Sequence, residues 1–279
     1  TAGDNTFEAA RMVNAAGAWA DVIAAMAGVP GLHAALRVHL VEASPVLRAE
    51  QARRITTHAP HWHDGADTLP DGPVLLIANE FLDALPIRQW RREGNGWSEI
   101  MVTEAGGTLA FAAAPPAPVP ELDHHDVPRG TIVERCPSLP ATVAAIAGRV
   151  GAGGAAILGD YGHWRSRGDT LQAMRGGVPV DPLADPGLAD LTAHVDFEAI
   201  ARHAPPARVS AMVTQGALLE RLGATARAQA LARGRGAAEV TAIAAAHRRL
   251  LHPAEMGDLF KAIALVPPGA ALPPGFEAA

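Results

Sequence analysis

The chain has 279 residues, of which 49% are hydrophobic, so it can bury a sizeable core in one large domain or two small ones. Its formal net charge of −6 gives no electrostatic support for a nucleic-acid-binding role, and no run of about 18 apolar residues predicts a membrane span. The single cysteine, Cys136, excludes a disulfide within the chain and fits a reducing compartment, so we expect a cytoplasmic protein.

The first part of the chain predicts alternating helices and apolar strands, the pattern of a mostly parallel sheet. Gly28 and Pro30 are stop signals for a helix, and Pro45 suits the first turn of the next one. The expected elements are a strand at 10–15 with a turn at Gly17, a helix at 20–27, a strand at 36–41, a helix from 45 to about 55, a loop at 57–73 and a strand at 74–77.

The middle of the chain changes character. Two-residue alternation over 87–113, broken by turn signals at 93–96 and 105–107, predicts an inserted three-stranded meander, which a Pro- and Ala-rich linker follows. The remaining expected elements are a helix at 140–150, a strand at 154–158, a long loop at 169–196, helices at 197–203, 215–222 and 237–251, strands near 209–213 and at 259–265, and a frayed tail at 267–279.

Three polar side chains, Asn79, Glu80 and Asp83, follow the apolar strand at 74–77. Ligands of open α/β sheets bind at the carboxyl ends of the strands, where an amide and two acids could hold a cation, a guanidinium or an amine. The alternative is a polar turn that caps the next segment. The spacing by itself leaves both interpretations open.

Two further acids end predicted strands. Glu42 closes the strand at 36–41, where it could bind the ribose hydroxyls of an adenosine-type cofactor, or it could be a surface acid before the helix at Pro45. Asp160 follows the strand at 154–158. Strands that end in acids at one sheet edge would together form one cleft.

Several other kinds of site lack their motifs. The chain has no glycine-rich phosphate loop and no nucleophile elbow of a serine hydrolase. Neither His61, His63 and Asp64 nor the cluster at 123–126 has the spacing of a structural zinc site, so we predict no metal, and Cys136 is interpreted as structural. A cleft with an acid for ribose and no phosphate loop suits S-adenosyl-L-methionine better than NAD or ATP.

Seven segments in one order resemble the signature blocks of a known family. This is the MidA-like family of class I S-adenosylmethionine-dependent methyltransferases, whose mitochondrial members resemble protein-arginine methyltransferases that assist assembly of respiratory complex I. The resemblance covers about 32–266. The matching segments are 41–51, 78–89, 159–162, 168–173, 189–197, 214–217 and 256–261.

The resemblance implies an α/β fold with a Rossmann-like methyltransferase sheet, into which 87–113 and a helical substrate region are inserted. It implies methyl transfer from S-adenosyl-L-methionine to a protein side chain, with arginine the leading candidate and a respiratory complex I subunit the candidate partner, in a bacterial cytoplasmic protein. The implied cofactor-binding residues are Gly17, Glu42 and Ser44, and the implied catalytic residues are Asn79, Glu80, Asp83 and Asp160. The resemblance also implies that Asp160 and the loop at 168–197 shape the substrate side.

The front of the chain departs from the family pattern. The family's glycine-rich first turn is missing, and residues 1–31 resemble a fragment of FAD-dependent amino-acid oxidases through the segment 13–21. We therefore expect a non-family piece at 1–31, a methyltransferase domain at 32–266 and a flexible tail at 267–279, and we do not predict FAD. Two alternatives stay open: a catalytically impaired assembly or interaction protein that keeps the fold, and an FAD-dependent oxidoreductase.

Overall fold

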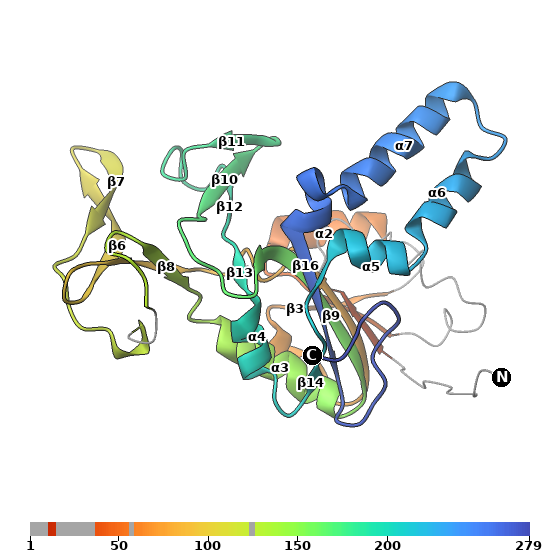
Figure 1. The fold of residues 1–279 in the computed structure, drawn as a ribbon, viewed down its shortest axis with the longest axis horizontal. Coiled ribbons are helices and arrows are strands. Elements are labelled where there is room, and N and C mark those ends of the chain that lie inside the picture. The colour runs from red at the N-terminus through yellow and green to blue at the C-terminus, as the bar shows by residue number, and fades with distance from the viewer. Residues whose placement is uncertain (1–10, 15–36, 56–58, 123–125) are drawn as a thin grey trace.

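The computed structural model describes residues 11–14, 37–55, 59–122 and 126–279 (Figure 1). A nine-stranded sheet forms its centre, with the order β14-β16-β9-β4-β1-β2-β3; in addition, β13 pairs with β9 and β15 pairs with β16. The strands β1 to β4 and β9 run parallel, and β16 is antiparallel to β9. The strands are β1 (Arg11–Asn14), β2 (Arg37–Val41), β3 (His61–His63), β4 (Val74–Asn79), β9 (Gly154–His163), β13 (Val195–Asp196), β14 (Arg208–Val209), β15 (Val213–Thr214) and β16 (Phe260–Val266).

Apolar layers cover both faces of β16. Successive strand residues point to opposite faces, so Ile263 and Leu265 belong to one cluster while Ala262 and Ala264 belong to another. The first cluster packs under α3 (Leu139–Gly151) and α4 (Phe197–His203), and the second under α5 (Gln215–Arg221) and the buried Phe276. This two-sided burial explains why all seven residues of β16 are buried.

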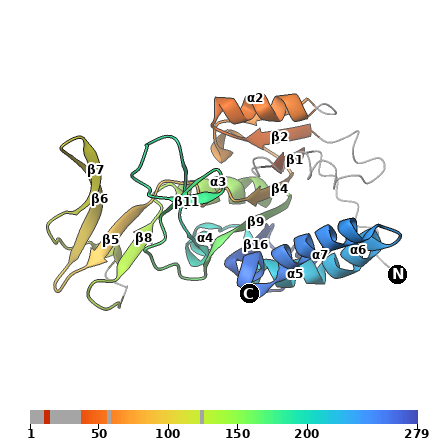
Figure 2. The same cartoon turned by 90° about the horizontal axis from the view of Figure 1, so that it is seen from above.

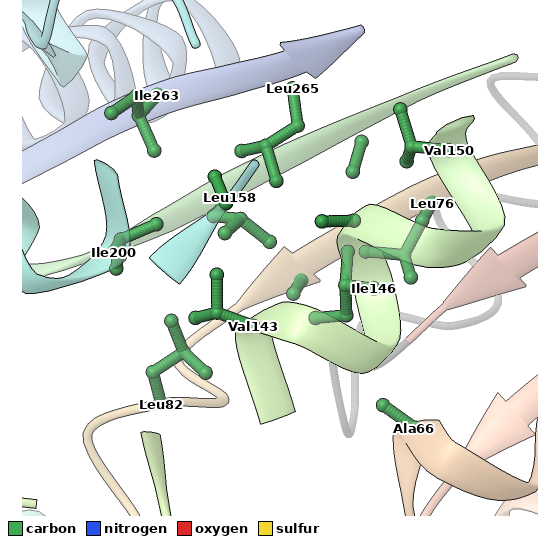
Figure 3. Packing of buried hydrophobic residues seen from close by; sticks show 14 of the residues in the cluster. Ala66, Leu76, Leu82, Val143, Ile146, Val150, Leu158, Ile200, Ile263 and Leu265 are labelled. Atoms are coloured by element: carbon green, nitrogen blue, oxygen red, sulfur yellow. The ribbon is translucent and has the colours of Figure 1, made fainter. Parts of the chain in front are cut away.

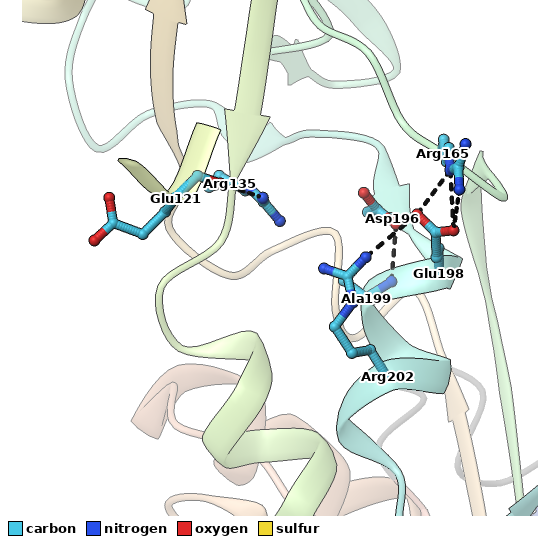
Figure 4. Close-up of polar contacts among 7 residues, drawn as sticks. All are labelled: Glu121, Arg135, Arg165, Asp196, Glu198, Ala199 and Arg202. Atoms are coloured by element: carbon cyan, nitrogen blue, oxygen red, sulfur yellow. Dashed lines mark hydrogen bonds and ion pairs between the residues drawn. The ribbon is translucent and has the colours of Figure 1, made fainter. Parts of the chain in front are cut away.

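The main core lies between α3 and the central strands (Figure 3). Helix α3 buries residues at helical spacing, so that one stripe faces the sheet. Its fully buried members and their strand partners are Val143, Ile146, Val150, Leu76, Leu158, Ile263 and Leu265. The start of α4 is fixed by Asp196, whose carboxylate accepts from the Ala199 N–H at 2.9 Å (Figure 4). On the same helix, Glu198 pairs with Arg165.

Two smaller sheets extend from this body (Figure 2). The first has the order β7-β6-β5-β8 and its own core around Trp90 and Trp97. The second has the order β11-β10-β12. Their strands are β5 (Arg88–Arg92), β6 (Trp97–Ala105), β7 (Thr108–Ala113), β8 (Ile132–Arg135), β10 (Gln172–Arg175), β11 (Val178–Val180) and β12 (Asp190–Thr192).

Helices complete the chain. Helix α2 (Pro45–Arg54) follows β2, and its N-cap Ser44 accepts from the Leu47 N–H. Helices α6 (Ala224–Ala232) and α7 (Ala237–Leu251) form a projecting hairpin with no fully buried residue (Figure 1). Short turns of helix are η2 (Ala66–Thr68), η3 (Pro120–Leu122) and η4 (Pro253–Gly257). No helix among the described residues combines the length and the apolar character needed to cross a membrane.

Most predicted elements are confirmed, but several predictions were wrong. The segment 57–73 contains β3, which pairs in parallel with β2 and so holds His61 and His63 on a strand. Strand β9 runs on to His163, so Asp160 lies within it. The segment 169–196 contains the second small sheet, and the strand expected near 209–213 is split into β14 and β15. The three-stranded meander over 87–113 is confirmed by β5, β6 and β7, and β8 joins its sheet from outside that segment. Local sequence patterns do not reveal such strands, because pairing with residues far apart in the chain stabilises them.

The end of the chain also differs from the expectation of a frayed tail. Phe276 is buried, the Ala211 N–H donates to the Glu277 carbonyl, and Ser210 bridges to Ala278. The tail therefore packs as the cover of the second cluster. Helix α6 was not predicted. The turn at Gly17 and the helix at 20–27 lie outside the described residues.

Candidate functional site

A cleft of about 1030 Å³ opens at the carboxyl ends of β2, β3 and β4. The ends of these strands and the segments that follow contribute Glu42 and residues 64–67, 79–81 and 83–85, and Tyr161 lines the cleft from β9. The small sheet completes it with Gln172 and Met174 from β10 and with Asp190 and Thr192 from β12. This is the edge where open α/β sheets bind ligands.

Glu42 stands in the cleft just after β2, and the turn around it is tightly bonded. Its carboxylate accepts from the Ser44 N–H at 2.8 Å and from the Gln51 side chain at 3.3 Å. Its own N–H donates to the His63 carbonyl at 3.0 Å, which ties the end of β2 to β3. Glu42 thus has a fixed position and keeps acceptor sites free, because a carboxylate has about four. Ser44 does not line the cleft; it caps α2.

Asn79, Glu80 and Asp83 all line the cleft. Glu80 is held by two donors: the Tyr161 hydroxyl at 2.8 Å and the Asn79 side chain at 3.2 Å. Its φ of 50° is in the left-handed region, which costs a residue with a side chain about 1–2 kcal/mol. The residue is strained where the chain turns out of β4 into the cleft, as is common at functional sites.

Asp160 lies behind this turn and not in the cleft. It is 2% exposed, and one carboxylate oxygen accepts the successive N–H groups of Phe81, Leu82 and Asp83 at 3.3, 2.9 and 3.2 Å. The other oxygen accepts the Tyr161 N–H at 3.1 Å. Asp160 is therefore a positioning residue: it fixes the backbone that carries the acids, and it does not face a ligand.

Asp83 and Asp160 form a buried pair of carboxyl groups. Burial raises the pKa of Asp83 to about 7, and the charges of Glu80 and Asp190 add to the effect. Burial also raises the pKa of Asp160. The charge of Asp83 adds to this rise, while the N–H groups that donate to the Asp160 carboxylate oppose it. With a pKa of about 7, Asp83 can gain or lose a proton near neutral pH.

The cleft residues that sequence reasoning did not name come mainly from the loop at 168–197, which the resemblance assigned to the substrate side as a whole. Gln172, Met174, Asp190 and Thr192 reach the cleft only because β10 and β12 pair with each other. The adjacent glycines at 176–177 between β10 and β11 were a hairpin signal that could have revealed them. Tyr161 was within a segment already singled out, next to Asp160.

The lining of the cleft carries one sign of charge. Among the described residues, six acidic side chains and no basic or histidine side chain line it. The acids are Glu42, Asp64, Asp67, Glu80, Asp83 and Asp190. Such a surface attracts cations, and carboxylates bind a guanidinium through paired hydrogen bonds. Within the described part of the chain, no group of three or more His, Cys, Asp or Glu side chains is placed to hold a metal ion.

Comparison with protein-family models decides the family. A model of S-adenosyl-L-methionine-dependent methyltransferases matches residues 17–213. The chain belongs to this family. It is 29% identical to a COG1565 superfamily protein from Burkholderia thailandensis whose crystal structure holds S-adenosyl-homocysteine, with a TM-score of 0.79 over 94% of this chain and 73% of that one. The predicted family and the class I methyltransferase fold are confirmed.

Curated relatives share the similarity. The protein arginine methyltransferase NDUFAF7 of Danio rerio mitochondria is 31% identical over 268 residues, which cover 86% of this chain and 63% of the relative. The Xenopus tropicalis protein of the same name is 32% identical, with 83% and 61% covered. The chain thus spans less than two thirds of the length of these relatives.

Proposed function

We propose that the chain transfers a methyl group from S-adenosyl-L-methionine to an arginine side chain of a protein. The observation that carries the proposal is the cleft of a methyltransferase-family chain lined by six acids and, among the described residues, by no cation. The relatives named protein arginine methyltransferase support the choice of substrate.

The residues around Glu42 fit the cofactor. Its carboxylate faces the cleft with free acceptor sites, which suits the two hydroxyls of a ribose. Residues 64–67 after β3 line the neighbouring part of the cleft. When bound, the cofactor supplies a methyl group on a positively charged sulfur. Gly17, the third predicted cofactor residue, lies outside the described residues.

The substrate side is formed by Glu80, Asp83 and Asp190. The guanidinium group of arginine binds carboxyl oxygens through paired hydrogen bonds, a role that suits Glu80 and Asp190. Asp83, with its pKa of about 7, is placed to take the proton that an arginine nitrogen releases on methylation. Tyr161 holds Glu80 in orientation through its hydroxyl. The cleft thus aligns the nucleophile and provides a nearby base.

The test combines binding and turnover. Calorimetry with S-adenosyl-homocysteine should show binding to the wild type, and Glu42→Ala should weaken this binding at least tenfold. The control is Glu104→Gln, which changes an exposed acid on β6 and should leave the binding unchanged. Arginine-containing peptides should gain methyl groups, and Glu80→Gln should abolish the gain. If millimolar S-adenosyl-homocysteine does not bind, the enzymatic proposal fails and the interaction-protein alternative gains.

The finer expectations stay predictions. A complex I subunit as substrate rests on the resemblance alone, and the curated relatives carry the word mitochondrial in their names whereas a bacterial cytoplasmic protein was expected here. The division into 1–31, 32–266 and 267–279, with 87–113 as an inserted substrate-side unit, is likewise a proposal.

A further inference from the structure

The two edges of the small sheet β11-β10-β12 differ in what they offer a further strand. Pro179 of β11 lies opposite Met174 of β10 and has no N–H to donate. The hydrogen bonds between these strands are therefore made by the neighbouring pairs, Ala173 with Val180 and Arg175 with Val178. Pro179 accordingly points its backbone groups away from the sheet, which blunts the outer edge of β11.

The same alternation fixes the direction of the backbone groups in β12. Because Ala173 bonds toward β11, Gln172 and Met174 bond toward β12, where their partners are Thr192 and Asp190. Leu191, between them, directs its N–H and C=O outward. Among the described residues no backbone partner is found for either group. The edge that β12 presents is therefore open.

The open edge lies beside the acid turn of the cleft. Ala193, two residues after Leu191, directs its backbone to the same side, and its N–H donates to the Asp83 carbonyl at 3.1 Å. A strand added along β12 would thus run toward the turn that carries Asp83. On the neighbouring face, Asp190 and Thr192 line the cleft, while Leu191 lies on the opposite face and is 48% exposed.

We propose that the substrate binds as an extended segment that adds a strand to β12 at Leu191 and places its arginine in the acidic cleft. The inference rests on the proposed function and specifies how the substrate is presented. Charge selects the occupant, because the cleft that the added strand would face is lined by acids and, among the described residues, by no base. Backbone hydrogen bonds to β12 would give affinity that does not depend on the substrate's sequence, and the acidic cleft would give specificity for arginine.

Strand geometry fixes where the arginine stands in the segment. In antiparallel addition, the residue opposite Leu191 exchanges both backbone hydrogen bonds with it and points its side chain away from the cleft. The residues before and after it point into the cleft. The arginine therefore directly precedes or follows the residue that pairs with Leu191, and its own N–H faces away from β12.

The first experiment measures peptide binding with S-adenosyl-homocysteine present, so it does not depend on turnover. The probe is a fluorescein-labelled nine-residue peptide with a central arginine flanked by alternating threonine and alanine. Backbone N-methylation next to the arginine should raise Kd at least tenfold, and N-methylation of the arginine itself less than twofold. If the segment adds in parallel, N-methylation of the arginine itself should have the larger effect. Equal effects of N-methylation at successive positions would overturn strand pairing. A citrulline peptide should bind at least tenfold more weakly.

The second experiment changes the protein. Leu191→Pro removes the outward N–H at an edge position, where proline is tolerated, and should raise the peptide Kd at least tenfold. Leu191→Ala keeps the N–H and should change it less than twofold. Unchanged binding of S-adenosyl-homocysteine shows that each variant is folded. Equal peptide affinity of the two variants would contradict the proposal.

The outcomes separate this inference from the proposed function. If the wild type methylates arginine peptides while neither N-methylation nor Leu191→Pro matters, the function stands and the docking edge is wrong. If peptide binding alternates with N-methylation but no methyl transfer occurs, the docking edge stands and the function fails. If sedimentation shows a wild-type dimer that Leu191→Pro dissolves, a second copy of the chain occupies the edge and the peptide proposal is overturned.

Discussion

The two sides of the cleft are built differently. The floor comes from β2, β4 and β9 of the central sheet, where Asp83 and Asp160 are buried and bonded over the main core. The opposite side, here called the lid, comes from β10 and β12. These strands belong to the three-stranded sheet β11-β10-β12, which has half-exposed side chains such as Leu191. Under the proposed function, the floor fixes Glu80 and Asp83, whereas the small sheet offers the open edge of β12 to the substrate. Precise positioning needs packed support, and varied substrates need an open edge.

The largest expected effect on stability comes from the core beneath the floor. Ile146→Ala removes a fully buried side chain of α3 and should lower the free energy of unfolding by about 2–5 kcal/mol. Val178→Ala in the small sheet, at a side chain that is 60% exposed, should change it by less than about 0.5 kcal/mol. Urea unfolding measures both. Equal losses would show that the floor and the lid do not differ in support.

Removal of the buried anchor should affect both stability and turnover. Asp160→Ala leaves the turn N–H groups of Phe81, Leu82 and Asp83 without their acceptor and should cost about 1–3 kcal/mol. Because Asp160 acts through the turn, kcat should fall while the Kd of S-adenosyl-homocysteine stays within about twofold. Asp160→Asn keeps an acceptor oxygen and should restore part of kcat. A variant with normal turnover would remove Asp160 from the account.

The raised pKa of Asp83 predicts a dependence on pH with a definite sign. The folded protein holds the proton up to a pKa of about 7, whereas the unfolded chain releases it near 3.8. The stability that this group contributes is therefore present at low pH and is lost as the pH rises through 7. Above pH 7, Asp83→Asn removes a buried charge and should raise Tm by about 2–4 °C for each kcal/mol gained in the free energy of unfolding. The gain should shrink toward pH 4.

The same substitution tests the role of Asp83 as a base. In the wild type, kcat/KM should rise with pH and level off above about 7, because only the ionised carboxylate can take a proton. Asp83→Asn should lose most of the activity and this rise. A pH profile that is the same in both proteins would contradict the assignment.

The smallest expected effect on stability belongs to the acid of the lid. Asp190→Asn should leave Tm nearly unchanged but raise KM for an arginine peptide by about tenfold, the value of one charge-assisted hydrogen bond. Glu104→Gln, an acid far along the β6–β7 hairpin, should leave KM unchanged. A large fall in Tm with Asp190→Asn would show that the lid is structural.

Local pattern predicted the floor much better than the lid. The apolar run of β4 and the acids after it are adjacent in sequence, so Asn79, Glu80 and Asp83 were placed in the cleft from spacing and resemblance. Asp160 was assigned to the cleft because its strand was expected to end before it. Instead β9 continues, and the Asp160 side chain is buried behind the turn at 80–83. The lid depends on pairing between 172–175 and 190–192, a non-local contact that local alternation does not reveal.

The central claim is that this acidic cleft methylates arginine, and mass spectrometry tests it most directly. The wild type, incubated with S-adenosyl-L-methionine and the central-arginine peptide, should add a methyl group to the arginine, while Glu80→Gln adds none and Glu104→Gln matches the wild type. The account predicts that a lysine peptide of the same sequence stays unmodified. Bound S-adenosyl-homocysteine together with an unmodified arginine peptide, or methylation by Glu80→Gln at the wild-type rate, would contradict it.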